Sequence, residues 1–297
     1  MNNNNFDDIF KSTDNNAGKS YEPFDKGEWA EMKKIEREFA FNTIDETLEN
    51  IKSSPEDYTV FLNVMSNFEK YSTGNILLIT NQMPDATRLL DSKAISKAEG
   101  HVKKGERGIV LLEPGEEYTR DDGSTGVNFK TKKMFDISQT TVKAIQRAEV
   151  KYDNRILLKA LIHDAPCKFE LVDRVEDDRN AYYNPADNTI YIKENMRAGD
   201  IFRAVTQELA HAHLDTGDTT RQDNAFMAYS VAYVLCNKYG IATETFSFNK
   251  LPDRFANYDT KEMRKEVNMI RTVVNDISND MAKLFEKQKA DKSKDAR

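Results

Sequence analysis

The chain has 297 residues, 39% of them hydrophobic and 31% charged, and it is long enough to bury one large core or two smaller ones. No apolar run approaches the roughly 20 residues that cross a bilayer, which excludes a membrane helix. The net charge of −7 excludes a surface covered in positive charge for duplex DNA, so any nucleic-acid site has to be local.

The N-terminus lacks both the basic and the apolar segment of a secretory signal, and we therefore expect a cytoplasmic protein with no membrane partner. The two cysteines, Cys167 and Cys236, each stand among apolar residues. That usage is typical of buried thiols in a reducing compartment.

The chain begins with a stretch that predicts no structure and continues with helices. Residues 1–24 carry too few large apolar side chains to offset the entropy of ordering, so we expect a disordered arm. Apolar residues recur at helical spacing over 29–51, which predicts an amphipathic helix. In "SSPED", Ser53 or Ser54 can cap a second helix that has Pro55 in its first turn.

Strand signals follow. "HVKKGERGIVLLEP" predicts a basic turn that leads into a buried strand, and "EEYTRDDGSTGVNFKTKKMFDIS" predicts a hairpin. After a polar helix, "CKFELVD" suggests a strand, and "NAYYNPADNTIYIKENM" predicts a second hairpin that turns over 184–188. Further helices are expected around 204–215, over 224–240 with Gly240 after the last turn, and over 260–287.

The helix "AVTQELAHAHLD" is one residue away from the H-E-x-x-H pattern, in which two histidines bind zinc and the glutamate is a general base. Gln207 stands in place of the first histidine, and a neutral amide oxygen is a poor zinc ligand. The following helix, 224–240, contains no Asp, Glu or His to serve as a third ligand. Glu208 and His211 remain, either as the base and one ligand of an atypical site or as parts of a packed helix.

Basic and aromatic residues gather in the first half of the chain. Lys103, Lys104 and Arg107 stand among glycines that let backbone N–H groups approach a phosphate. Upstream, "FEKYSTGN" offers Phe68 and Tyr71 as stacking surfaces, with further polar side chains beside them. Single-strand binding without sequence preference uses this combination, whereas a solvated turn beside core aromatics is the alternative interpretation.

Three blocks in the first half, "FLNVMSNFEKYSTGNILLITNQMPDAT", "HVKKGERGIVLLEP" and "MFDISQT", resemble the N-terminal domain of ArdC-type antirestriction proteins and LtrC-like conjugal-transfer proteins, which binds single-stranded DNA. "NTIYIKENM", "VTQELAHAHLD" and "FMAYSVAYVLCNKYGIATETFSF" resemble their zincin-like metallopeptidase domain. The resemblance implies single-stranded DNA binding on a mobile or conjugative element, in antirestriction or transfer support. The DNA-binding candidates that it implies are Tyr71, Ser72, Asn75, His101, Lys103, Lys104 and Arg107.

The second half departs from the family pattern, which has His where Gln207 stands and Glu where Tyr229 stands. We therefore expect no catalysis and no bound zinc or other cofactor. A zinc metallopeptidase with an atypical site on Glu208 and His211, and a module that docks to conjugation or restriction proteins, stay as alternatives.

These observations predict an α+β protein in two domains. N-terminal helices with a small antiparallel sheet form a DNA-binding domain over 25–148. A zincin-like helical domain with a β-hairpin and a degenerate metal site covers 149–288, and a flexible tail covers 289–297.

Overall fold

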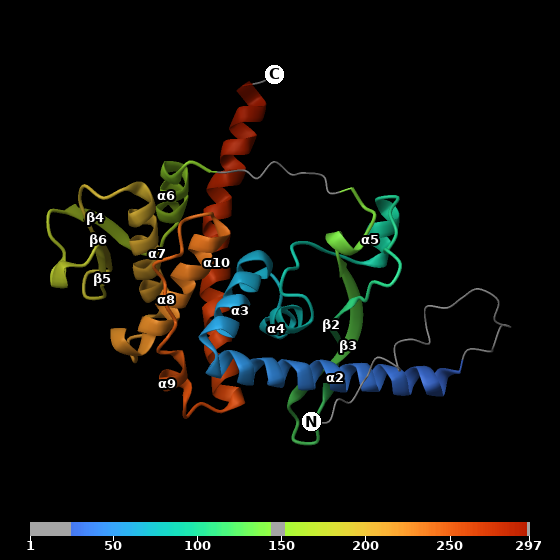
Figure 1. The fold of residues 1–297 in the computed structure, drawn as a ribbon. Coiled ribbons are helices and arrows are strands. Elements are labelled where there is room, and N and C mark those ends of the chain that lie inside the picture. Colours follow the sequence, from blue (N-terminus) through green and yellow to red (C-terminus); the bar gives the residue numbers. More distant parts are fainter. Residues whose placement is uncertain (1–24, 144–151, 296–297) are drawn as a thin grey trace.

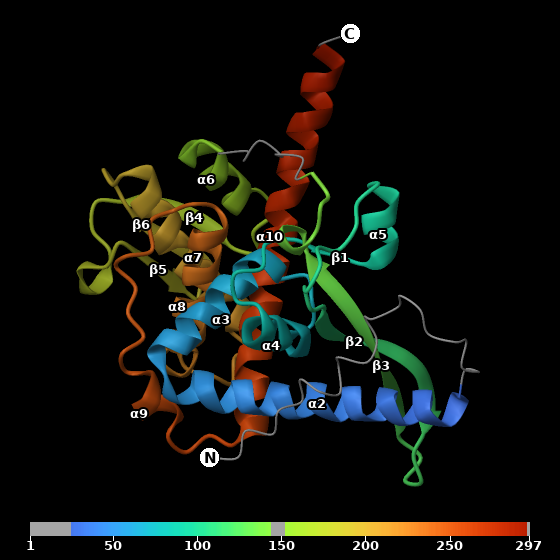
Figure 2. The ribbon, with the colours of Figure 1, turned by 45° about the vertical axis from the view of Figure 1, so that its right-hand side comes forward.

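The computed structural model describes residues 25–143 and 152–295, with the side chains of 288–295 left aside. Helices and two small sheets form an α+β fold, as predicted (Figures 1 and 2). The expected arm, 1–24, and residues 144–151 of the polar helix expected over 140–165 lie outside the described residues. The first half contains α2 (Lys26–Ser53), α3 (Pro55–Phe68), α4 (Thr73–Gln82), β1 (Leu89–Leu90), α5 (Ser92–Lys97), β2 (Ile109–Thr119) and β3 (Thr125–Asp136).

The helix starts follow from local capping chemistry. The Ser54 hydroxyl accepts a hydrogen bond from the Asp57 N–H at 3.1 Å, and Pro55 is the first residue of α3, so the prediction from "SSPED" is confirmed. Ser72 caps α4 in the same way through the Asn75 N–H.

In the first sheet, the buried strand expected after the basic turn and the first arm of the predicted hairpin form one strand, β2, and a short strand, β1, is added. β2 and β3 pair antiparallel, and β1 pairs with the far edge of β3, which leaves β2 at the other edge. Side chains of α4 occupy that free edge. The Asn75 amide exchanges two hydrogen bonds with the backbone of Leu112, at 2.8 and 2.9 Å, and the Gln82 amide does the same with Val110, at 2.8 and 3.0 Å. Each amide therefore replaces one residue of a missing strand.

The second sheet has three strands, β4 (Lys168–Val172), β5 (Ala181–Asn184) and β6 (Thr189–Lys193). β5 and β6 form the second predicted hairpin. β4 pairs parallel with the other edge of β6, an arrangement that the local sequence pattern does not predict. The α6 helix (Asn154–His163) precedes β4 and lies beside α10.

The C-terminal helices are α7 (Ala198–Leu214), α8 (Arg221–Lys238), α9 (Leu251–Phe255) and α10 (Thr260–Asp295). Gly240 follows α8 with a φ of 69°, as expected for a glycine after the last turn. α10 continues to Asp295, into the segment 289–297 that is expected to be a flexible tail and whose Lys and Ala residues are good helix formers.

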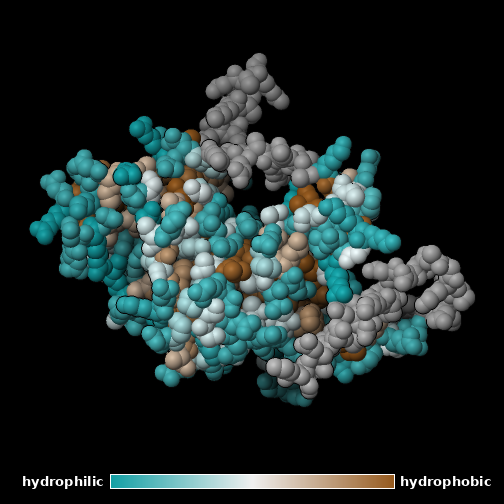
Figure 3. Space-filling model, in the orientation of Figure 1, coloured by the Kyte–Doolittle hydropathy of each residue, from teal (hydrophilic) through white to brown (hydrophobic). Residues whose placement is uncertain are grey.

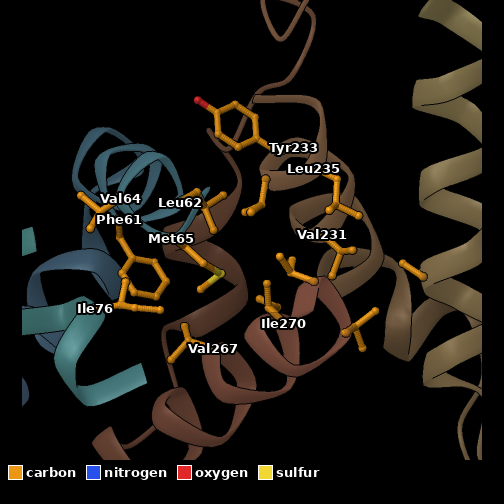
Figure 4. Close-up of a cluster of buried hydrophobic side chains, with 14 of the residues drawn as sticks. Phe61, Leu62, Val64, Met65, Ile76, Val231, Tyr233, Leu235, Val267 and Ile270 are labelled. Carbon is orange, nitrogen blue, oxygen red and sulfur yellow. The ribbon is translucent and has the colours of Figure 1, made fainter. Parts of the chain in front are cut away.

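One hydrophobic core joins the two predicted domains. In Figure 4, Phe61, Leu62 and Met65 of α3 lie opposite Val231 of α8 and Ile270 of α10. Polar bonds cross the same boundary: the buried Tyr58 and Ser230 hydroxyls are 2.9 Å apart, and the Lys238 ammonium is 2.6 Å from the Glu69 carboxylate. α3 therefore packs as part of the C-terminal helices as well as of its own domain.

The outer surface is mainly polar. Figure 3 shows hydrophilic side chains over most of one face, with smaller hydrophobic patches scattered among them. Over 25–143 and 152–295, no helix is both long and apolar enough to span a membrane.

Candidate functional site

The basic turn, residues His101–Gly108, is fastened to the segment that follows β3. The Lys103 N–H donates to the Gln139 carbonyl and the Thr141 N–H donates to the His101 carbonyl, both at 2.9 Å. Gly105 adopts a φ of +86°, a conformation that other residues reach only with strain. The turn is therefore a fixed extension of the first sheet.

The segment behind the turn, 136–140, is itself held by side-chain bonds. Burial alone would raise the pKa of Asp136, but hydrogen bonds from the backbone N–H groups of Arg88, Ser138 and Thr87 lower it below its ordinary value. The Gln139 amide donates to the Arg107 carbonyl at 2.8 Å. The block "MFDISQT" thus forms the support of the basic turn.

The turn presents its basic side chains on the outside, where His101, Lys103, Lys104 and Arg107 are all exposed. The Lys103 ammonium donates to the Ser138 carbonyl at 2.7 Å, and His101 Nδ1 lies 3.1 Å from the Thr141 hydroxyl. These bonds orient two of the four side chains while leaving them accessible to an anionic ligand.

The other DNA-binding candidates lie elsewhere. Tyr71 is half-buried, with its ring edge-to-face with Phe68 at a centroid distance of 5.7 Å, and burial raises its pKa. The Ser72 hydroxyl caps α4, and the Asn75 amide is bonded to the β2 backbone. These three side chains are thus engaged in a ring contact, a helix cap and a sheet edge, and none of them belongs to the basic turn.

Ser72 and Asn75 instead line a groove of about 470 Å³ between α2, α4, the first hairpin and the start of α10. No local sequence pattern indicates this groove, because its walls come from segments far apart in the chain. We call it the α10 groove; it is lined by Phe41, Ile44, Ser72, Thr73, Gly74, Asn75, Leu112, Phe129, Lys261, Arg264, Lys265 and Asn268.

Glu208, the surviving carboxylate of the degenerate metal helix, is paired with a cation from α8. Both of its oxygens accept from the Arg221 guanidinium, at 2.6 and 2.7 Å, and one also accepts from the Tyr183 N–H at 2.8 Å. Only 5% of the Glu208 side chain is exposed. A carboxylate held in this way is an acceptor in a bidentate ion pair rather than a free base.

His211, one turn after Glu208 on α7, lines a cavity of about 90 Å³ together with Arg221, Asp215 and Asn224. Burial lowers the pKa of His211 to about 3, and the positive charges of Arg221 and Arg179 add to that effect. The imidazole is therefore neutral, with a permanent cation in the position next to it.

The two substituted positions do not complete a ligand set. Tyr229 packs against Phe246 and Phe248, and its hydroxyl accepts from the Ser247 N–H at 2.8 Å, so it belongs to an aromatic cluster. Gln207 supplies only a neutral amide. In the part of the chain that the structure describes, no three His, Cys, Asp or Glu side chains come together as a metal site. A divalent cation does not fit these residues, because Arg221 already supplies the positive charge that Glu208 binds.

Comparison with known proteins gives this arrangement a context. Residues 34–152 match the N-terminal domain of the anti-restriction factor ArdC. The match includes the basic turn and its support, together with the α2, α4 and hairpin walls of the α10 groove. It stops before Glu208, Arg221 and α10.

Two crystal structures of the antirestriction ArdC protein from the R388 plasmid are similar to most of the fold. The Mn(II)-bound one is 17% identical, with a TM-score of 0.57 over 80% of this chain and 98% of that chain. The metal-free one is 14% identical, with a TM-score of 0.50 over 72% of this chain and 86% of that chain. The likeness to ArdC therefore extends as a fold beyond the matched domain.

An uncharacterized protein of Bacillus anthracis, pXO2-81, is 24% identical over 82% of this chain and 50% of its own length. The chain thus spans about half the length of this curated relative.

Proposed function

We propose that this chain binds single-stranded DNA through the basic turn, in an antirestriction or transfer-support role on a mobile element. The observation that carries the proposal is the presentation of four exposed basic side chains on a turn whose backbone is fixed by residues 136–141. The lysine and arginine cations on this turn can neutralise phosphates without the entropic cost of first ordering the turn backbone. The match to the ArdC N-terminal domain supports the same function. In this proposal the chain binds the DNA in the cytoplasm.

We also propose that the C-terminal part keeps zincin-like packing but has no metal-dependent peptidase activity. Arg221 supports this, because its guanidinium binds both oxygens of the carboxylate that a metallopeptidase would need for activating water. Of the candidate residues, Asn75 acts as a scaffold in this proposal, and the lysines and Arg107 bind the strand.

The DNA-binding proposal is tested by titrating a labelled single-stranded oligonucleotide at several salt concentrations. The logarithm of the binding constant should fall linearly with the logarithm of salt concentration, by about 0.7 for each phosphate neutralised. Replacing Lys104 by Ala should reduce the slope by about 0.7, and the Lys103→Ala/Lys104→Ala variant by about 1.4.

Lys159 and Lys168 provide the matched control, because both are exposed and lie on α6 and β4, across α10 from α4 (Figures 1 and 2). Their double alanine variant should leave the slope unchanged. Affinity that ignores salt, or a preference for duplex over single strands, would contradict the proposal.

The metal proposal is tested separately by elemental analysis of protein purified without chelators. Because functional zinc sites bind tightly enough to survive purification, a chain without such a site should retain less than about 0.1 equivalent of zinc. A value near one equivalent would overturn the proposal for the C-terminal part and leave the DNA-binding proposal standing.

A further inference from the structure

We propose that the α10 groove is a second contact for the same single strand, in which the Phe41 and Phe129 rings hold a base and the Lys261 and Lys265 ammonium groups hold its phosphates. This inference rests on the proposed function. It adds a site whose basic wall lies in α10, more than 100 residues beyond the matched ArdC domain.

Phe41 and Phe129 form the aromatic wall of the groove, and both are more exposed to solvent than aromatic side chains usually are. Phe41 and Phe129 are 39% and 38% exposed, and their rings lie edge-to-face at a centroid distance of 6.0 Å. Two rings at an angle of 82° form a corner that can receive a flat group against one of them. Base stacking on aromatic rings is the sequence-tolerant part of single-strand binding.

The basic wall is electrostatically unfavourable without a ligand. Lys261 and Lys265 are exposed and lie one turn apart on α10, a spacing at which like charges repel. Lys261 also lies in the first turn, where the positive end of the helix dipole disfavours a cation. Among the described residues neither lysine forms an ion pair, whereas the neighbouring Arg264 is paired with Asp45 at 2.6 Å. A phosphate group would relieve both repulsions.

The size of the groove fits this occupant. Its volume, about 470 Å³, lies within the ~300–1,000 Å³ typical of sites that enclose a small organic group. The groove floor is fixed, because Asn75 is bonded to Leu112 and the Thr73 hydroxyl donates to Asn268 at 3.0 Å. The site is therefore formed before binding, by helices and strands rather than by mobile loops.

The stacking role is tested in the full chain by comparing a normal oligonucleotide with one that contains abasic positions. Loss of a stacked base should weaken wild-type binding about 5-fold or more, from ~1 kcal/mol or more per stacked base. In the Phe41→Leu/Phe129→Leu variant, the normal oligonucleotide should bind about 5-fold or more weakly, and the penalty for abasic positions should disappear. Leucine keeps the apolar bulk, so a purely structural role of the rings would leave that penalty unchanged, which would overturn the proposal.

The phosphate role is tested with Lys261→Ala/Lys265→Ala, which should reduce the salt slope by about 1.4 while Lys159→Ala/Lys168→Ala does not. Normal binding by both groove variants, with loss only in Lys103→Ala/Lys104→Ala, would reject the groove and keep the basic turn. Absence of any wild-type binding to single strands would reject the proposed function and this inference with it. Far-UV circular dichroism of each variant confirms that the fold is retained.

Discussion

Arg221 is a residue whose position is understood only through its distant partner. It begins α8, where the helix dipole disfavours a cation, and the bidentate bond to Glu208 compensates for this. Glu208 could be singled out from the sequence because it belongs to a local motif. Arg221 could not, because the two residues lie on different helices and no periodicity relates them, although a cation in a first turn is itself an unusual signal.

Replacing Arg221 by Met should lower the free energy of unfolding by about 3 kcal/mol, because it leaves a buried carboxylate unpaired. The estimate is at the lower end for a broken buried pair, since the Arg221 side chain is 29% exposed. Urea denaturation measures it, with the exposed Arg155→Met as the matched control. Adding Glu208→Gln should restore part of the loss; equal stability of the Arg221 and Arg155 variants would contradict the pairing.

His211 predicts a specific acid sensitivity. Its pKa is lowered from 6.5 to about 3 by burial and by the positive charges of Arg221 and Arg179. Between these two pH values, His211 binds a proton in the unfolded chain but not in the folded chain. The contribution of His211 to the free energy of unfolding is therefore complete above about pH 6.5. It is lost as the pH falls toward 3, by up to ~1.4 kcal/mol per pH unit. Burial also lowers the pKa of His213, which acts in the same direction.

Unfolding free energies measured between about pH 5 and 6.5 separate the histidines from the carboxylates, which titrate mainly below that range, and comparison with a His211→Gln variant separates His211 from His213. The His211→Gln variant should show a smaller slope of unfolding free energy against pH, by the equivalent of roughly one proton. An unchanged slope would show that His211 is protonated in the folded chain.

At the scale of elements, most of the fold could be predicted where the chemistry is local. Capping at Ser54, the glycine after α8 and the two hairpins follow from neighbouring residues and are found as expected. The parallel pairing of β4 with β6, and the Asn75 and Gln82 amide bonds to β2, could not be predicted from the sequence. They depend on segments that only the folded core brings together.

Replacing Asn75 by Leu should destabilise the chain by about 2–4 kcal/mol, because the N–H and C=O of Leu112 both lose their partner in a buried place. Hydrogen exchange at the Leu112 amide should accelerate in the same variant. Ser72→Ala removes only a cap and serves as the milder control, at about 1 kcal/mol. Full stability of Asn75→Leu with weakened DNA binding would instead place Asn75 in direct contact with the strand.

At the scale of the whole molecule, the α10 groove and the core both cross the boundary predicted near residue 148. The end of the first hairpin and the polar helix expected after it suggest a boundary, but they carry no information about which helices α3 will meet. The groove was missed for the same reason: its aromatic rings and its lysines are separated by more than 100 residues.

A fragment of residues 25–148 should therefore fail to fold cooperatively on its own. It would expose Tyr58, Phe61 and Leu62, which are fully buried in the whole chain. We expect the fragment to bind a hydrophobic dye and to melt without a sharp transition, whereas the full chain melts in one step. A cooperative transition of the fragment would show that the N-terminal part is an independent domain.

The shared core also has a consequence for synthesis on the ribosome. α3 and α4 emerge early, yet their apolar faces are covered by α8 and by an α10 whose core residues extend to Phe285. At ~5–20 residues per second, roughly 10–40 s separate the appearance of α4 from that of Phe285. During that time the nascent chain presents an uncovered helical surface, so its yield in a cell should depend on chaperones that bind such surfaces until the last helix is made.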